Sequence, residues 1–366
     1  MNRFSITRRQ ALFIFVICTI SSKLQTLPCL ISEDVGSNLW MVLLFGGIID
    51  AVFFALIIWA NHICPDLTFY DLLVKTIGKF LAKLVMVLLV IYFLFTALMP
   101  YEAVRNVFAN NLFDTLPWQG FAIFLVFAVG YLVFCGLKTI GRSAELYLVI
   151  LVTCVTLLFL LGIFTANFEN ILPLFDAKLD KIASSYLDHS LWFGDYMIFF
   201  CLIGRVDTSK KALKFWDVLI YAGLIIFYAL GYVTFYCLYT DLSSSQTSLL
   251  SSISSFSLIE LSVGRADWLL VIICQIASVL SLSTYTYCIA DSLNNIIGKK
   301  HYAICAIISI AIIYVLDIVL FSHTGTSIHG YLHLTGIVAL IIQTILPLLC
   351  ILCTICYKKR SKRSLL

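Results

Sequence analysis

Lys23 is the feature of this sequence that most needs a chemical explanation, because it lies inside an apolar stretch. The polar run 21–28 surrounds it and ends at Pro28, which lacks a backbone donor and clashes with the carbonyl of Leu24. We therefore expect the helix to open here and to expose backbone groups to a ligand. A simple proline kink, with the Lys23 ammonium reaching back to the membrane surface, is the alternative.

A second polar interruption pairs Gly194 with Asp195 inside another apolar stretch. Glycine tolerates the backbone angles of an unwound segment, and the aspartate offers a charge to a cavity. Since an unpaired charge in hydrocarbon is costly, Lys23 should pair with an acid, and Asp195 and Asp50 both lie at a suitable depth. The two interruptions are therefore candidate halves of one binding site.

The composition excludes a water-soluble protein. Apolar residues make up 61% of the 366 positions and charged residues 12%, which is too few to cover a soluble surface. The net charge of +4 is spread over short basic runs between apolar stretches, which argues against nucleic-acid binding. Most of the 13 cysteines lie inside apolar stretches, so no disulfide framework is expected.

Motifs for enzymatic chemistry are absent from the sequence. It has no glycine-rich phosphate loop, no His-Glu-x-x-His and no Gly-x-Ser-x-Gly elbow. We therefore predict that the protein is not an enzyme and has neither a cofactor nor a metal site.

Ten segments are long enough to cross a membrane as helices, which takes about 20 mostly apolar residues. They form one predicted domain, 1–366, with helices at 10–31, 39–60, 80–99, 120–137, 145–165, 186–204, 215–239, 267–288, 302–321 and 334–356. Short cytoplasmic loops collect Lys and Arg. In the ten-span arrangement nineteen of the 24 basic residues fall on one side of the membrane, so both termini are predicted to be cytoplasmic.

Two loops on the predicted outer side are longer than the others, at 166–185 and 240–265. Both mix apolar and polar residues, which is typical of short helices on a membrane surface. For the Ser-rich second loop, a flexible chain is an equal alternative.

The two interrupted helices, the first and the sixth, occupy equivalent places in two halves of five helices each. This pattern is typical of inverted-repeat transporters, whose ligand sites form where broken helices expose backbone groups. The eighth helix adds Ser283 and Tyr287, which are i, i+4 neighbours on one face. Hydroxyls on helices often bond to their own carbonyls, so these two matter only if that face meets the broken helices.

Short motifs occur in order along the chain, at residues 6–10, 26–28, 141–145, 170–173, 193–195, 264–267 and 346–347. Their order and spacing resemble the B subunit of bacterial spore germinant receptors, a branch of the amino acid-polyamine-organocation transporter superfamily. The chain has Ser21 or Ser22 where the family commonly has Gly, and Asp195 where it has Glu. The resemblance therefore does not identify the ligand.

The resemblance implies a leucine-transporter-like fold in the inner membrane of a spore, with both termini in the cytoplasm. It also implies a small germinant such as an amino acid, a membrane-embedded A-type subunit and a lipoprotein C-type subunit as partners. The implied ligand pocket maps to Ser21, Ser22, Lys23, Gln25, Thr26, Thr96, Ala97, Gly194, Asp195, Ser283 and Tyr287. In this fold the unwound parts of the first and sixth helices face each other, which favours Asp195 over Asp50 as the partner of Lys23.

Three functions fit these features. The first is a receptor subunit in which germinant binding shifts the helical bundle and the change passes to partner subunits. The second is a proton-coupled amino acid permease that uses the same site. The third, a structural membrane scaffold, leaves the broken helices unexplained. The resemblance to the germinant-receptor branch favours the first.

Overall fold

Helices make up nearly all of the structure. The computed structural model describes residues 6–65, 67–111, 118–173, 175–206, 213–256, 260–261, 264–265, 267–298, 301–319 and 332–363. Within these ranges the only strands are β1 (Glu260–Leu261) and β2 (Gly264–Arg265), which pair as an antiparallel hairpin. The predicted all-α class is confirmed for the described residues.

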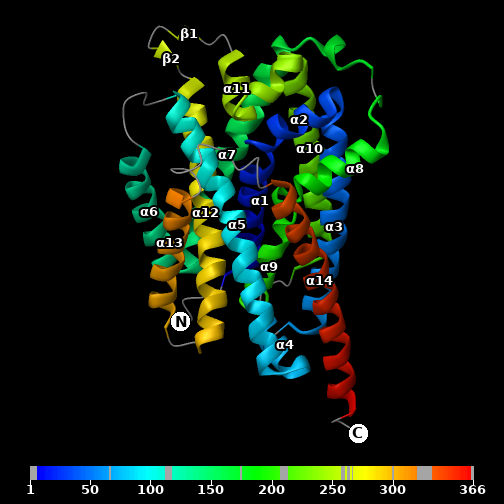
Figure 1. The fold of residues 1–366 in the computed structure, drawn as a ribbon, viewed down its shortest axis with the longest axis vertical. Helices are drawn as coiled ribbons and strands as arrows, with labels where there is room; N and C mark the ends of the chain where they lie inside the picture. The colour runs from blue at the N-terminus through cyan, green and yellow to red at the C-terminus, as the bar shows by residue number, and fades with distance from the viewer. Residues whose placement is uncertain are drawn as a thin grey trace.

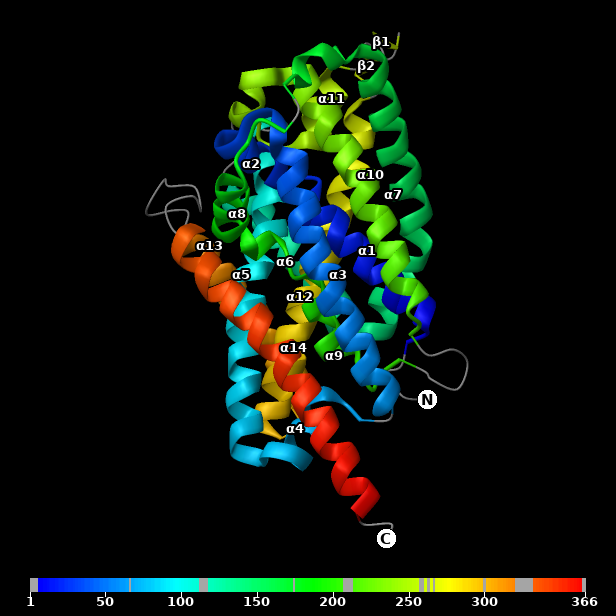
Figure 2. The ribbon, with the colours of Figure 1, turned by 90° about the vertical axis from the view of Figure 1, so that its right-hand side faces the viewer.

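The long helices lie side by side in one elongated bundle (Figures 1 and 2). They are α1 (Arg8–Lys23), α3 (Leu39–Ile63), α5 (Lys79–Asn111), α6 (Trp118–Cys135), α7 (Leu137–Thr165), α10 (Trp216–Tyr239), α12 (Asp267–Ile297), α13 (Tyr302–Asp317) and α14 (Leu332–Arg363). The short helix α11 (Leu249–Phe256) and the hairpin lie at one end, here called the α11 end. The short helix α4 (Phe69–Ile77) and the last turns of α14 lie at the other, the α4 end.

The outward faces of the bundle are apolar. Large side chains such as Phe124, Leu146 and Phe164 are 73%, 79% and 83% exposed, whereas soluble proteins rarely expose contiguous apolar surface. Six helical stretches in the described part of the chain are long and apolar enough to cross a membrane: Leu27–Ile63, Lys79–Arg105, Leu137–Thr165, Trp216–Ser245, Val271–Ile297 and Thr335–Arg360. The protein is therefore an integral membrane protein, and the count of ten spans stays a prediction.

Several helices are longer than predicted. α5 continues past residue 99 to Asn111, α12 past residue 288 to Ile297, and α7 begins at Leu137 instead of residue 145. The apolar stretches end where polar residues begin. Helical hydrogen bonds are internal to the backbone, so a helix can continue beyond its apolar stretch. The prediction also missed α4, whose first turn is capped by the Thr68 side chain, which accepts from the Asp71 backbone N at 3.2 Å.

The predicted first span is two helices. α1 starts with a capping box between Thr7 and Gln10 and ends at Lys23, and α2 (Leu27–Val35) resumes after a short non-helical segment. Pro28 lies in the first turn of α2, where a missing backbone donor is tolerated. The predicted opening is confirmed, and a simple kink is excluded because α1 and α2 are separate helices.

The sixth helix, predicted at 186–204 with an interruption at Gly194 and Asp195, is broken in the structure. The chain there forms α8 (Leu179–Asp188), the 3-10 turns η3 (Ser190–Trp192) and η4 (Asp195–Ile198), and α9 (Phe199–Leu202). Gly194 separates the two turns with φ = 82°, a left-handed conformation that breaks the helix and favours glycine. The break is confirmed, but it extends over more residues than expected.

Both long loops contain short helices, as predicted. The first holds the 3-10 turn η2 (Phe168–Ile171) and the start of α8, and the second holds η5 (Thr240–Ser245) and α11. The backbone N–H of Leu249, at the start of α11, donates to the carbonyl of Gln25 at 2.9 Å. The second loop is therefore tied to the break of the first span.

Two of the sequence motifs meet toward the α4 end. Ile6 forms an isolated bridge with Val206, and its backbone N–H donates to the Arg205 carbonyl at 3.0 Å. The next residues reach α7, where Arg9 and Gln10 contact Glu145 at 3.2 and 3.1 Å. Motifs 6–10 and 141–145 are thus parts of one packing contact.

Candidate functional site

The Lys23 side chain lies fully buried between the two broken elements. Its ammonium forms an ion pair with Asp195, donates to the Trp192 carbonyl at 3.4 Å and lies 3.3 Å from Asp50. It also lies 5.1 Å from the centroid of the Phe193 ring, close enough for a cation–π contact. The predicted pairing with Asp195 is confirmed, and Asp50, the other candidate, is a second partner.

The two acids are held by different neighbours. Both carboxylate oxygens of Asp195 accept from the Ser22 hydroxyl, at 3.0 and 3.1 Å, and one also accepts from Tyr285 at 3.4 Å. Asp50 accepts from the Gly194 backbone N–H at 3.0 Å and from the Tyr221 hydroxyl at 2.9 Å. The site therefore joins α1, α3, η4, α10 and α12.

α5 and α14 hold the unwound backbone of the second break. Gln343 donates from its amide to the carbonyls of Ser190 and Phe193, at 2.9 and 2.8 Å. Tyr92 donates to the Gly194 carbonyl at 3.3 Å. These side chains satisfy carbonyls that a continuous helix would have paired internally.

A side chain at position 194 would not fit. A Cβ atom there would overlap the Gln343 amide and lie 2.8 Å from the Tyr92 hydroxyl. Positive φ and close packing therefore both require glycine.

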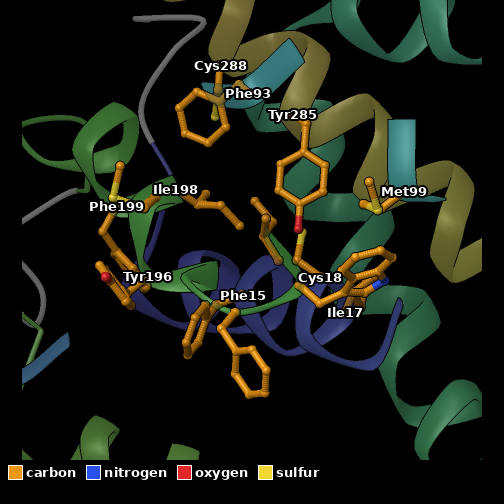
Figure 3. Packing of buried hydrophobic residues seen from close by; sticks show 14 of the residues in the cluster. Phe15, Ile17, Cys18, Phe93, Met99, Tyr196, Ile198, Phe199, Tyr285 and Cys288 are labelled. Carbon is orange, nitrogen blue, oxygen red and sulfur yellow. The ribbon is translucent and has the colours of Figure 1, made fainter. Parts of the chain in front are cut away.

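The face of α12 that meets the site carries Ser278, Ser281 and Tyr285. Ser278 accepts from Gln25 and from Ser21, and Ser281 donates to the Ile17 carbonyl at 3.4 Å. Figure 3 shows the Tyr285 hydroxyl pointing toward Cys18, among buried aromatic side chains. The predicted pair, Ser283 and Tyr287, lies two residues along from Ser281 and Tyr285, which is about 200° around the helix and therefore nearly the opposite face.

Ser283 and Tyr287 have other contacts. Ser283 donates to the Val279 carbonyl of its own helix at 2.7 Å. The Tyr287 hydroxyl accepts from Arg205, and its ring packs near Tyr302 of α13. The structure thus does not bring these two side chains to Lys23, and their role in ligand binding stays a prediction.

The other predicted residues lie closer to the two breaks. Thr26 accepts from the Trp192 indole at 3.3 Å, which links the two breaks a second time. Thr96 and Ala97 are buried on α5, and the Thr96 hydroxyl donates to the Tyr92 carbonyl at 3.0 Å.

Three polar atoms beside the first break are buried without a hydrogen-bond partner in the described chain. They are Oε1 of Gln25, Oε1 of Gln275 and Oγ of Ser248. Gln25 donates to Ser278, one turn from Gln275 on α12, and its carbonyl accepts from the residue that follows Ser248. A buried acceptor without a donor is unfavourable, so this cluster is suited to a ligand with hydrogen-bond donors.

The sequence prediction missed several side chains of the site. Tyr221, Tyr285 and Gln343 lie in otherwise apolar helices, and only their polar atoms inside a span could have marked them. Within the described residues, no group of three or more His, Cys, Asp or Glu side chains is placed to hold a metal ion.

Comparison with known proteins identifies the family. Residues 5–326 match the model of a family described as spore germination protein. The chain belongs to this family. Spore germination protein YndE of Bacillus subtilis (strain 168) is 24% identical over 212 residues, which are 57% of this chain and 58% of that protein. Spore germination protein A2 of the same strain is 24% identical over 315 residues, 83% of this chain and 84% of that protein.

The two relatives are matched to different extents. The alignment spans less than two thirds of the first relative and most of the second. The chain is therefore a membrane-spanning spore germination protein.

Proposed function

We propose that this chain is the B-type subunit of a nutrient germinant receptor. In this role it binds a small, amino acid-like germinant between its two broken helices and signals to an A-type and a C-type partner subunit. The proposal includes a ten-span leucine-transporter-like domain in the spore inner membrane, with both termini in the cytoplasm. Membership of the spore germination protein family supports the germination role.

The observation that carries the proposal is the pair of helix breaks joined by the Lys23–Asp195 ion pair. Broken helices place polar backbone groups in the centre of a membrane protein, which is where transporter-like proteins bind ligands. The unpaired acceptors of Gln25, Gln275 and Ser248 lie next to the first break. They suit the donors of a ligand ammonium or hydroxyl group.

A conformational change caused by ligand binding at the two breaks can be transmitted to the α11 end. A ligand that binds only one arrangement of the breaks shifts the equilibrium toward that arrangement by its differential affinity. Because α2 and α8 pack against each other and α11 hydrogen-bonds to Gln25, a change at the breaks reaches the α11 end. In the proposed orientation this end faces away from the cytoplasm.

A germination assay tests the proposal. Spores without this chain should fail to germinate with some of the single amino acids that trigger the parent, and the wild-type chain should restore the response. Gln25→Leu should shift the germinant dose-response about fivefold or more, because loss of a buried ligand hydrogen bond costs about 1–3 kcal/mol. Gln246→Leu, a half-buried glutamine at the α11 end, serves as the matched control. An unaltered germinant spectrum without the chain would contradict the proposal.

A vesicle experiment separates the receptor from a proton-coupled permease. The purified chain in proteoliposomes is expected to bind the radiolabelled germinant identified in spores but not to exchange it across the membrane. Rapid counterflow of the same amino acid would instead establish a permease.

A further inference from the structure

The centre of the site holds two acids and one base. Lys23, Asp50 and Asp195 are 0%, 2% and 4% exposed, and the ammonium contacts both carboxylates. With both acids ionised, the cluster would carry one net negative charge in the interior of a membrane protein. Burial of such an uncompensated charge is strongly unfavourable. One more positive charge is needed for balance.

The surroundings provide no second base. The titratable groups that interact with Asp50 come from α1, η4, α5, α8 and α10, and they are Lys23, Asp195, Tyr92, Tyr186, Tyr196 and Tyr221. Tyrosine is neutral or negative and never positive. Within the described residues, Lys23 is therefore the only cation that faces the two acids, and a proton is the simplest additional charge.

We propose that Asp50 is a proton-binding site, occupied at neutral pH with the proton on Oδ2. The ionised form is stabilised more strongly at Asp195 than at Asp50, because Asp195 forms the close ion pair with Lys23 and accepts from the Ser22 hydroxyl on both oxygens. The Lys23–Asp50 contact is longer, at 3.3 Å. Charge-assisted hydrogen bonds favour the ionised form, so the proton belongs on the other acid.

The geometry around Asp50 can accommodate the proton. Oδ1 accepts from the Gly194 backbone N–H, and Oδ2 lies 3.3 Å from the Lys23 ammonium, so a hydrogen carried on Oδ2 has to point toward Tyr221. Oδ2 lies 2.9 Å from the Tyr221 oxygen, and a tyrosine hydroxyl can accept as well as donate. The protonated acid then donates to Tyr221, and Lys23 and Asp195 remain as a balanced pair. This inference concerns the protein without ligand and does not depend on the proposed function.

Infrared spectroscopy of the purified full-length chain tests the proposal. A protonated carboxylic acid has a C=O stretch above the amide I band, and the wild type should show one that disappears as the pH is raised. Asp50→Asn should remove this band, and Asp34→Asn, whose carboxylate is 39% exposed, should keep it. Asp195→Asn should also remove it, because Asp50 then becomes the only partner of Lys23. Lys23→Met should increase it, because neither acid then has a base.

Two results would overturn the proposal. One is a wild-type spectrum without an acid band at neutral pH, which would mean that both acids are ionised. The other is a band that persists in Asp50→Asn, which would belong to another residue. If Asp50→Asn does not fold, Asp50→Glu keeps the carboxyl group and should shift the band in frequency, whereas an unshifted band again contradicts the assignment.

Discussion

The charged groups at the centre of the bundle and those toward the α4 end follow different rules. The central cluster has two acids for one base, and all three are buried. Toward the α4 end three arginines each pair with one acid, in Arg8–Asp217, Arg205–Asp291 and Arg9–Glu145. The arginine side chains there are 19%, 16% and 65% exposed.

This difference separates two tasks. One-to-one pairs at a bundle end fasten helices to each other, and their contribution depends on how far water screens them. An unbalanced cluster at two helix breaks is costly to bury and makes the site sensitive to any added charge. The pairs toward the α4 end therefore hold helices together, whereas the central cluster can respond to protons or ligands. Substitutions in the central cluster should have larger effects than substitutions in the pairs toward the α4 end.

The largest effect is expected at the centre. Lys23→Ala and Asp195→Ala should each reduce protein accumulation, because breaking a buried pair costs about 3–5 kcal/mol, and the loss should be smaller for Asp195→Ala because Asp50 remains as a partner of Lys23. The double variant Lys23→Asp with Asp195→Lys should recover part of the loss. Accumulation in spores and thermal melting in detergent measure both effects. Silent single variants would disprove the importance of the pair, as would an Asp50→Asn variant that reproduces the Lys23→Ala defect while Asp195→Asn does not.

The sequence was sufficient to predict the two breaks and a buried acid beside Lys23, whereas the choice of Asp195 over Asp50 rested on the family resemblance. Lys23 is a base deep inside an apolar stretch, Pro28 removes a backbone donor from the helix, and glycine at position 194 accepts the left-handed backbone that ends a helical segment. Helix ends were less predictable, because α5 and α12 continue where polarity rises.

The tertiary partners could not be predicted. Tyr221 and Gln343 become part of the site only through the packing of α10 and α14, which a sequence pattern does not encode. On α12 the i, i+4 rule selected Ser283 and Tyr287, whereas the face that meets the break carries Ser278 and Tyr285. Periodicity defines a face but not the neighbour that the face contacts.

A smaller effect is expected from the α4 end. Arg205 pairs with Asp291 and Tyr287, so Arg205→Gln should weaken the hold of the chain after α9 on α12 by about 1.5–3 kcal/mol. Cys201, buried between these elements, should then react faster with a maleimide on an otherwise cysteine-free background. Arg8→Gln is the control, because it disrupts the ion pair between Arg8 of α1 and Asp217 of α10, which does not involve α12. Equal labelling rates in both variants and the wild type would show that Arg205 does not hold the chain after α9 against α12.

Gly194→Ala should destabilise the protein by about 1–3 kcal/mol, because the added methyl group meets both a strained backbone and the Tyr92 hydroxyl. Gly223→Ala is a matched control, since no atom lies within 4 Å of its added Cβ. Thermal melting should fall for the first variant and stay level or rise for the second. Equal melting temperatures would mean that the second break tolerates a side chain.

The two faces of α12 should differ in a dose-response assay. Tyr285→Phe removes the hydroxyl that donates to Asp195, which should weaken the germinant response by about 0.5–1.5 kcal/mol, or roughly two- to tenfold. Ser283→Ala removes a hydroxyl that bonds to its own helix and should have little effect. A larger shift for Ser283→Ala would mean that the face of α12 with Ser283 and Tyr287 binds the ligand.

The smallest effect is expected for Arg9, the most exposed base of the three pairs toward the α4 end. Its guanidinium lies 3.2 Å from Glu145, and its side chain is 65% exposed. Exposed pairs contribute about 0.2–1 kcal/mol because water and salt screen them. Glu145 also keeps its hydrogen bond from Gln10 when Arg9 is lost. Arg9→Ala should therefore leave accumulation and the germinant response nearly unchanged, and its small loss of thermal stability should vanish in high salt. A loss as large as that of Lys23→Ala, and insensitive to salt, would show that the motif at residues 6–10 does more than fasten α1 to α7.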